Sequence, residues 1–459
     1  MTEMSRHLVR VATCLASSAL LLLLPLADAG AAPRSPIDPE PAWVATLSAA
    51  TGDTAWANGA VTATRGNAVF VSGRLDSEAA GSDITTVAYR ANDGRILWQA
   101  SYDGDLHGSD NARDLAVSDD GTLLFVLGQT PGDLGRVVTI AYDTTSGEQQ
   151  WTAVYGSWAN PTEVVAAGDR VFVTSQRQVD GRNVYATVAY DARSGEQLWE
   201  AQYGFGDSSA SVRDLAVSPD GERLFVTGQV RPAGTLGQYG TVAYDVHTGE
   251  QLWDAQFGVP GGLAFPEDIA VSPDSRRVYV TGTSDDASGD TGAGTVGYDA
   301  GTGQRVWSAR YNSEFGSTDA ASALTVSPDG ETVYVGGHAF ESFLLSHLVT
   351  LAYDADTGEQ RWVDLYEAEG GDWNQALDLV ARRDHLYVTG RAVGIPALAF
   401  GSDGTRQSMV GYGAGSYFAG RSQGIELAVT HNNRTLVAVG HLRNADGDLE
   451  WTVAGFRLR

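Results

Sequence analysis

The sequence predicts an all-β protein, an eight-bladed β-propeller whose four-stranded antiparallel blades form one closed ring. Three observations support this prediction: one unit recurs eight times along the chain, every unit contains two hairpin-like segments, and the strand that the last unit lacks stands near the N-terminus. A repeat of about 50 residues that alternates strands with turns is typical of propeller blades, because each blade is one small sheet stacked on its neighbours.

The first segment of the unit ends one strand, makes a turn and begins another strand. Its clearest example is Val-Ala-Tyr-Asp-x-x-Thr-Gly-Glu-Gln-Leu-Trp at residues 242–253. The tyrosine of this segment recurs about every 50 residues, as Tyr89, Tyr142, Tyr190, Tyr244, Tyr298 and Tyr353, with Phe400 in the next place. The second segment ends in Val280-Thr281-Gly282 in the same unit and in similar triplets in the others.

Both segments are predicted to be hairpins. Apolar residues alternate with small or polar ones over short stretches, which is the period of a β-strand. The interruptions are turn sequences such as Ser218-Pro219-Asp220-Gly221, in which proline presets φ and glycine accepts a positive φ. Two hairpins supply the four strands of one blade.

The two ends of the chain are predicted to share the last blade. Residues 451–456 resemble the third strand of the unit, but no fourth strand follows them. The segment Trp43-Val44-Ala45-Thr46-Leu47 matches that fourth strand. We therefore expect the N-terminal strand to complete the eighth blade, which removes two exposed sheet edges, and we expect the propeller to span residues 43–459.

Residues 1–29 are predicted to be a secretory signal, and residues 30–42 a polar linker. Two arginines precede an apolar run at residues 11–26, and Ala27-Asp28-Ala29 has the small-x-small pattern of a cleavage site. An uncleaved anchor is the alternative, although the run is short for a membrane span. We expect a secreted or cell-envelope protein with no membrane span in the mature chain.

Composition excludes several classes of function. The chain has 30 Lys+Arg against 57 Asp+Glu and a net charge of -27, and lysine is absent. Because nucleic-acid binding depends on cationic neutralisation of phosphates, no nucleic-acid partner is expected. The one cysteine, Cys14, lies inside the predicted signal, so the mature chain has no disulfide, thiolate metal site or cysteine nucleophile.

A pattern Ala-x-Asp-x-x-Ser/Thr-Gly-x-x-x-Trp runs over residues 141–151, 189–199, 243–253 and 352–362. It resembles the tryptophan-docking motif of the eight-bladed quinoprotein alcohol dehydrogenases and their non-enzymatic relatives. The resemblance implies that the motif lies on the outer strands and that its tryptophan packs between neighbouring blades. The docking positions are Trp43, Trp98, Trp151, Trp199, Trp253, Trp307 and Trp362, whereas Ser408 stands where the unit around Phe400 is expected to have tryptophan.

The resemblance also raises the question of a cofactor. Pyrroloquinoline quinone enzymes of this family typically use a vicinal cysteine pair over the quinone and a cationic group near it, and the cysteine pair is impossible here. No Cys-x-x-Cys-His haem site exists either. We therefore expect no cofactor, with the quinone and Ca²⁺ left open as alternatives.

Two recurring features predict a site at the mouth of the central channel. Loops between units carry an aromatic ring or a histidine that could stack on a sugar or plug the core, namely Trp56, His107, Trp158, Phe205, Phe265, Phe315, Trp373 and Tyr417. An acidic residue precedes the inner strand in six units, as Asp114, Glu163, Asp214, Asp268, Asp378 and Glu426. Such carboxylates could hold a hard cation or accept bonds from amides of the neighbouring blade. The loops Asp103-Gly104-Asp105 and Asp446-Gly447-Asp448 lack the full ligand spacing of a calcium loop.

Catalytic motifs are absent from the sequence, which has no His-Glu-x-x-His, Gly-x-Ser-x-Gly or phosphate-loop pattern. We therefore expect a secreted, non-catalytic propeller that serves as a binding or scaffold module for a protein or a glycan. The candidate channel-mouth residues are Asp114, Asp214, Asp268, Asp378, Glu426, Trp56, Trp158 and Trp373. The alternative is an exported quinoprotein-type oxidoreductase, or a polysaccharide lyase or hydrolase, working from the same mouth.

Overall fold

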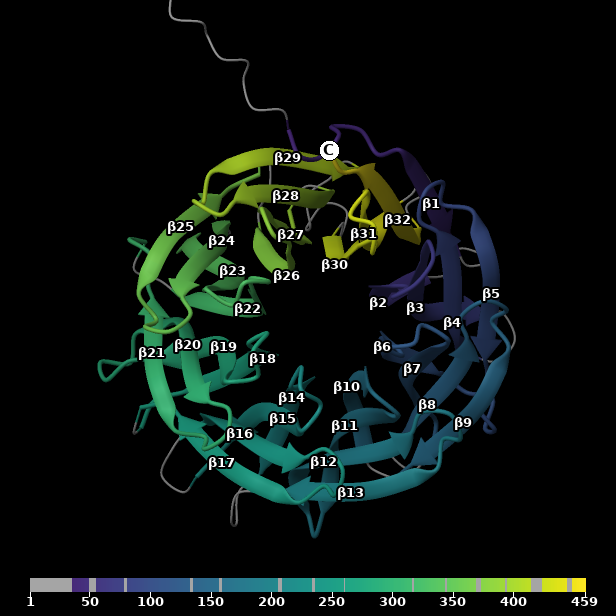
Figure 1. Cartoon of the computed structure of the whole chain (residues 1–459), viewed down its shortest axis with the longest axis horizontal. Helices are drawn as coiled ribbons and strands as arrows, with labels where there is room; N and C mark the ends of the chain where they lie inside the picture. Colours follow the sequence, from purple (N-terminus) through teal and green to yellow (C-terminus); the bar gives the residue numbers. More distant parts are fainter. Residues whose placement is uncertain are drawn as a thin grey trace, which may run out of the picture. The chain divides into compact units, whose positions relative to one another are not determined.

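The computed structural model describes residues 35–48, 55–77, 81–132, 135–156, 159–204, 209–232, 236–259, 261–315, 318–342, 345–368, 373–392, 394–413, 423–443 and 448–459. The regular elements over these residues are strands, β1 to β32, in eight four-stranded sheets. Figure 1 shows the sheets as blades around one ring, with the first strand of each blade nearest the centre. The predicted eight-bladed propeller is confirmed. Within these ranges no helix is long and apolar enough to cross a membrane.

Successive strands within a blade pair antiparallel, as a chain of hairpins requires. The first four blades consist of β2 (Ala55–Thr62), β3 (Ala68–Ser77), β4 (Gly81–Arg90) and β5 (Ile96–Tyr102); β6 (Asn111–Val117), β7 (Leu123–Thr130), β8 (Arg136–Asp143) and β9 (Gln149–Tyr155); β10 (Ala159–Ala167), β11 (Arg170–Val179), β12 (Arg182–Asp191) and β13 (Gln197–Tyr203); and β14 (Ala210–Val217), β15 (Arg223–Val230), β16 (Gln238–Asp245) and β17 (Gln251–Phe257).

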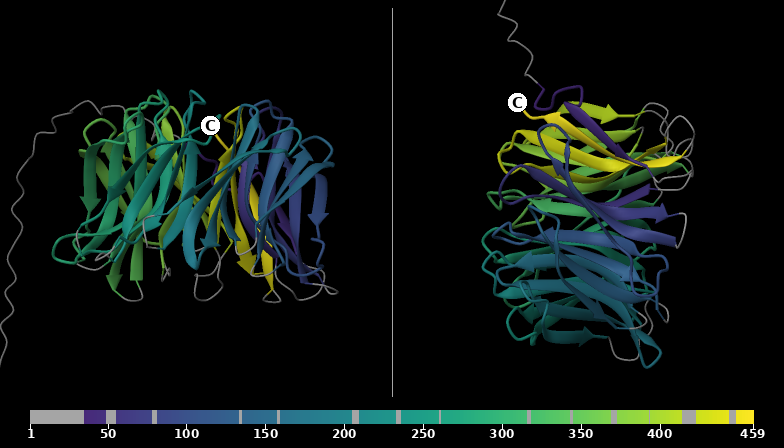
Figure 2. Two further views of the ribbon diagram at one scale, coloured as in Figure 1. Left: turned by 90° about the horizontal axis from the view of Figure 1, so that it is seen from below. Right: turned by 90° about the vertical axis from the view of Figure 1, so that its right-hand side faces the viewer.

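The remaining four blades complete the ring, and Figure 2 shows their strands from two sides. They consist of β18 (Ala264–Val271), β19 (Arg277–Asp285), β20 (Thr291–Asp299) and β21 (Arg305–Tyr311); β22 (Asp319–Val326), β23 (Thr332–Ser342), β24 (Leu345–Asp354) and β25 (Gln360–Tyr366); β26 (Gln375–Ala381), β27 (His385–Arg391), β28 (Ile395–Gly401) and β29 (Arg406–Tyr412); and β30 (Gln423–Val429), β31 (Thr435–Arg443) and β32 (Leu449–Arg457) with β1 (Trp43–Leu47).

Both ends of the chain contribute to the eighth blade, as predicted. Strand β1 pairs antiparallel with β32, from Trp43 opposite Gly455 to Leu47 opposite Trp451. The chain upstream of β1 also packs on this blade, because Ile37 is fully buried and forms a bridge to Leu458. Closure thus uses more of the N-terminal region than the strand alone.

The docking tryptophans join each blade to the next. In all seven, the indole Nε1 donates a hydrogen bond of 2.8–3.2 Å to a backbone carbonyl in the turn between the third and fourth strands of the following blade. Trp43 bonds the Ala91 carbonyl in this way, so the N-terminal strand joins the last blade to the first. The packing between blades that the resemblance implied is therefore present at every one of these positions.

A glycine in each receiving turn makes room for the indole. Gly94, which receives Trp43, has a φ of +69°, and Gly249, which receives Trp199, has a φ of +72°. A Cβ at either position would come within 2.3 Å and 2.7 Å, respectively, of the indole carbons. Glycine is required twice over at these turns, for the left-handed backbone and for the close approach.

The junction between the seventh and eighth blades has Ser408 in place of a docking tryptophan. The fourth strand of the last blade is β1, so β32 and β1 are not joined by a turn that an indole could cover. The N-terminal segment fills this place instead, and the hydroxyls of Ser35 and Ser408 are joined by a 2.8 Å hydrogen bond. The departure from the repeat is therefore a consequence of how the ring closes.

Replacing Trp43 by alanine should lower the free energy of unfolding by about 3–5 kcal/mol, because a buried indole and its hydrogen bond are lost. Trp253→Ala is the matched control, since Trp253 makes the same contact between the fourth and fifth blades. Urea unfolding followed by circular dichroism measures both. A cost below about 1 kcal/mol at Trp43, beside a large cost at Trp253, would show that β1 does not close the ring as described.

Replacing Ser408 by tryptophan, the residue that the repeat has at this position, should destabilise the protein. The Ser408 side chain is only 8% exposed, so an indole there would displace the N-terminal segment, at a cost of about 1–3 kcal/mol. Ser408→Ala is the control that removes the hydroxyl without adding volume. Higher stability of Ser408→Trp in urea unfolding would contradict this explanation of the missing tryptophan.

Candidate functional site at the channel mouth

A β-bulge in every inner strand sets the side chains that face the channel. The register between first and second strands shifts by one residue in all eight blades, for example between Ala112 and Asp114 and between Val212 and Asp214. The residue that follows the bulge is the acidic residue of the repeat in six blades, and it is Gly59 and Ala323 in the other two. The six acidic residues therefore lie around the channel wall in a set that we call the carboxyl ring.

Backbone amides of neighbouring blades satisfy four of these carboxylates. Each accepts a hydrogen bond of 2.6–2.8 Å from the amide that follows the equivalent position in the next blade, and the pairs are Asp114 with Val164, Asp214 with Ile269, Asp268 with Leu324, and Asp378 with Leu427. These bonds link the inner strands just as the indoles link the outer ones. The carboxylates thus have the amide partners that the sequence left open as the alternative to a cation.

Protons on some members of the carboxyl ring reduce the repulsion between neighbouring carboxylates. The Glu163 carboxyl is hydrogen-bonded to that of Asp114, and the Asp268 carboxyl to that of Asp214. Burial raises the pKa of Asp214 and of Asp378 to about 6. Burial and the neighbouring carboxylates raise the pKa of Glu163, Asp268 and Glu426 well above their usual range.

Part of this ring opens into a hollow of about 480 Å³ that we call the channel hollow. It brings together Trp56, Asp114 and Glu426 of the predicted candidates and adds residues from the bulges and from β31. Its lining is Trp56, Ala57, Asn58, Arg113, Asp114, Thr162, Glu163, Arg213, Glu267, Ile425, Glu426 and His441. Asp214, Asp268, Asp378 and Trp373 do not line it, and Trp158 lies outside the described residues.

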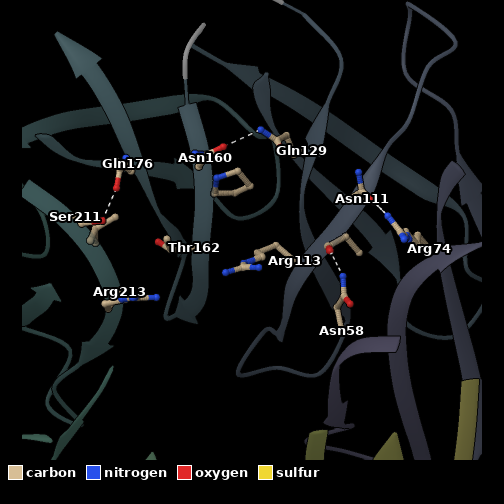
Figure 3. Close-up of a pocket in the computed structure, with 13 residues that line it drawn as sticks. Asn58, Arg74, Asn111, Arg113, Gln129, Asn160, Thr162, Gln176, Ser211 and Arg213 are labelled. Carbon is tan, nitrogen blue, oxygen red and sulfur yellow. Dashed lines mark hydrogen bonds between the residues drawn. The ribbon is translucent and has the colours of Figure 1, made fainter. Parts of the chain in front are cut away.

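A second hollow of about 480 Å³, the rim hollow, shares Asn58, Arg113, Thr162 and Arg213 with the first. Figure 3 shows Arg113 and Arg213 extending into it from the two sides of Thr162, with amide and hydroxyl side chains around them. The Arg213 guanidinium lies 3.9 Å from the Glu267 carboxylate. Arg113 forms no ion pair within 4.0 Å inside the described ranges.

Polar side chains on the rim form bridges between blades. Arg74 donates to Asn111 at 3.2 Å and Gln129 donates to Asn160 at 2.9 Å, in each case across a blade boundary. Arg74 also lies over the Trp56 ring, with 5.9 Å between its Cζ and the ring centroid. These contacts hold the wall of the rim hollow in a fixed arrangement, which is what preorganised binding needs.

Aromatic residues at the mouth are held against other side chains. Trp56 meets His441 edge-on, with ring centroids 4.6 Å apart, and Arg391 lies 5.6 Å from the Trp373 centroid. Burial lowers the pKa of His441 to about 4, so this ring is neutral at pH 7. Phe205 and Tyr417 lie outside the described residues.

Five polar or charged lining residues were not predicted from the sequence, and each lies at a bulge: Arg113, Arg213, Glu267, Asn58 and Thr162. In a regular strand a residue next to an inward-facing one points to the other face. At a bulge two consecutive residues oppose one partner, so both neighbours reach the channel. The available signal was the arginine directly before the aspartate in both Arg113-Asp114 and Arg213-Asp214.

The family described as outer membrane protein assembly factor BamB matches residues 40–219 and 185–382. The chain belongs to this family. No curated protein matches the chain.

Solved structures share its fold at low identity. BamB from Moraxella catarrhalis is 15% identical with a TM-score of 0.51, covering 90% of this chain and 100% of that chain. Sqt1 from Chaetomium thermophilum, bound to the N-terminus of the ribosomal protein L10, is 14% identical with a TM-score of 0.62, covering 92% and 100%. Quinohemoprotein alcohol dehydrogenase from Comamonas testosteroni is 13% identical with a TM-score of 0.57, covering 92% and 80%. At these identities the likeness shows the fold alone.

The carboxyl ring should make stability fall as pH rises from 5 to 8. The ring carboxyls of the folded protein have raised pKa values, so they keep protons that the unfolded chain has already lost near pH 4. Their contribution is fully present below the unfolded pKa and disappears as pH rises through the folded pKa. Glu163→Gln, which removes one of these protons, should reduce the slope of unfolding free energy against pH, measured in urea.

Asp403→Asn is the control for this slope. Hydrogen bonds with the backbone and side chain of Thr405 lower the pKa of Asp403, so its titration lies below the window. Its slope between pH 5 and pH 8 should equal that of the unmodified protein. Equal slopes for Glu163→Gln and the unmodified protein would contradict proton sharing in the ring.

Proposed function

We propose that this chain is an exported, non-catalytic binding module whose channel mouth receives an anionic or hydroxyl-rich segment of a protein partner. The observation that carries the proposal is the pair of arginines, Arg113 and Arg213, that extend into the rim hollow. The rest of its lining is a third arginine, Arg74, which bonds Asn111, together with amide, hydroxyl and small apolar side chains. Guanidinium groups bind carboxylates through paired donors, and amide side chains add directional bonds to hydroxyls or peptide groups.

The net charge of the chain supports this choice of ligand site. With a charge of -27, the surface as a whole repels an acidic ligand, so a hollow lined by three arginines marks the place where such a ligand would be accepted. The carboxyl ring below them limits how deep an anion can enter. A binding mode at the mouth, rather than inside the channel, follows from this arrangement.

The comparisons favour a protein as the partner over a glycan. The matching family is described as an assembly factor, and Sqt1 was solved bound to the N-terminus of a ribosomal protein. We propose the secretory signal at residues 1–29 as the means of export. The cross-linking experiment below distinguishes a glycan ligand from a protein partner.

The enzyme alternative rests on the likeness to quinohemoprotein alcohol dehydrogenases. The carboxyl ring argues against a quinone in the channel, because a cofactor that itself carries carboxylates would face the ring members that are charged at pH 7, such as Asp214 and Asp378 with a pKa of about 6. The seven docking indoles are also committed to backbone carbonyls between blades and are not free to stack on a flat ring in the channel.

Site-directed cross-linking tests the proposed binding. Because the mature chain lacks cysteine, Thr162→Cys can carry a photoreactive group in the rim hollow, and Asp356→Cys can carry it on an exposed turn as the control. We expect the first variant to capture one protein from the cell envelope of the producing organism and the second not to capture it. Capture of glycan alone at position 162 would replace the protein partner by a sugar.

Binding of the captured partner should depend on the two arginines. Arg113→Ala together with Arg213→Ala should weaken it by roughly tenfold or more, since two charge-assisted contacts are lost, while Arg276→Ala, at an exposed turn, should leave it unchanged. Titration calorimetry measures all three. Dye reduction with an alcohol or a sugar, after reconstitution with quinone and Ca²⁺, would refute the non-catalytic function.

A further inference from the structure

We propose that the loop between the first and second blades holds a calcium ion, bound by the carboxylates of Asp83, Asp103 and Asp110 and by the hydroxyl of Thr130. Asp83 comes from β4, Asp103 and Asp110 from the connection between β5 and β6, and Thr130 from the end of β7. This site is distinct from the channel mouth, and it does not depend on the proposed function.

The three carboxylates converge, and inside the described residues only Asp103 has an ion-pair partner. One oxygen of each lies within 4.8 Å of the oxygens of the other two. Asp103 pairs with the exposed His107, at 2.7 Å from its Nδ1. In the part of the chain that the structure describes, Asp83 and Asp110 have no ion pair within 4.0 Å. Three like charges at this spacing need a compensating ligand.

Two buried oxygens face the same small space and have no partner. The Asp110 side chain is 0% exposed, and its Oδ2 accepts the Gly104 amide at 3.0 Å, but its Oδ1 accepts no bond from the described residues. The Thr130 hydroxyl, 1% exposed, is likewise unpaired there. The point where a Gly104 Cβ would stand is 2.2 Å from Thr130 Oγ1 and 2.8 Å from Asp110 Oδ1. A buried polar group normally has a partner.

The equivalent loop between the sixth and seventh blades shows which hydrogen-bond donor is missing at Asp110. Asn374 stands four residues before Asp378, as Asp110 stands four residues before Asp114, and its Oδ1 accepts the Ala368 amide at 3.3 Å. Its Nδ2 donates to the Ser346 carbonyl at 2.7 Å. At position 110 an acceptor, Oδ1, takes the place of that donor. A cation bound there would give this oxygen a partner, as the Ser346 carbonyl gives one to the Asn374 amide.

The loop between the fifth and sixth blades balances its charge with arginine. Asp319 is the counterpart of Asp110 there, and the neighbouring Arg310 lies 3.4 Å from Asp286 and 3.7 Å from Asp290. The residue of β5 in the place of Arg310 is Ser101, three positions after the docking tryptophan in both blades. The first loop thus has the acidic side chains but not the arginine.

Calcium fits this set of donors better than magnesium or a transition metal. All four side chains offer oxygen, the ligand of hard cations, and Ca²⁺ accepts irregular sets completed by water. Oxygens on opposite sides of Ca²⁺ are about 4.6–5.2 Å apart, against about 4.0–4.2 Å for Mg²⁺. The three carboxylate oxygens, all within 4.8 Å of one another, fit inside a Ca²⁺ coordination sphere.

Calorimetric titration of the chelator-stripped propeller with CaCl₂ tests the proposal. We expect one ion bound per chain, with a dissociation constant on the order of 10⁻⁴–10⁻³ M, and a rise in melting temperature with Ca²⁺. Asp110→Asn should weaken binding at least tenfold while leaving the stripped protein no less stable, because its amide would donate to the Ser82 carbonyl as Asn374 donates to that of Ser346.

Matched variants separate this site from other acidic groups. Asp103→Asn, at an exposed carboxylate, should also weaken Ca²⁺ binding, while Asp319→Asn should leave the titration unchanged. The proposal is overturned if the unmodified protein gives no Ca²⁺ heat and no thermal shift at 10 mM, or if Asp110→Asn binds as tightly. A response to Mg²⁺ as strong as that to Ca²⁺ would overturn the choice of ion.

Discussion

The indole of each docking tryptophan lies over the turn of the next blade, and the rest of the ring depends on this contact. It buries a large apolar surface, satisfies a turn carbonyl through Nε1, and requires glycine beneath the ring. Seven such contacts, one of them from Trp43, leave a single junction of another kind, where the N-terminal segment packs beside Ser408. The position of the chain ends and the single break in the repeat have the same physical origin.

A second set of contacts ties the inner strands together and determines what the channel can hold. The bulge turns an acidic side chain toward the next blade, where its carboxylate accepts a hydrogen bond from a backbone amide. In two pairs it is also hydrogen-bonded to the carboxyl of the neighbouring acidic residue. This arrangement serves cohesion, and it leaves the mouth above it to arginines and neutral polar groups. The structural acids and the accessible cations are consecutive residues, so one irregularity in the strand creates both.

The fold could be predicted from the sequence because its determinants are local. The turn glycine, the tryptophan four residues later and the alternation of the strands recur in register, and the closing strand at residues 43–47 matches the same pattern. The candidate site was predicted only in part, since Trp56, Asp114 and Glu426 meet in the channel hollow but Arg113 and Arg213 were missed. Bulge positions have no period that reveals them. The proposed calcium ligands come from three segments of two blades, and no spacing along the chain brings Asp83 and Thr130 together.

Native-state hydrogen exchange on a chain that lacks residues up to Leu47 tests most directly whether the indole contacts form one closed ring. In the intact protein, the amide of the receiving glycine in each turn, such as that of Gly94 bonded to the Arg90 carbonyl, should exchange slowly. Without β1, we expect protection to fall first at this turn and at β32 and then throughout the ring, because the first and last blades have lost their junction. Unchanged protection of all the other turns, with faster exchange confined to β32, would contradict a ring that depends on these contacts.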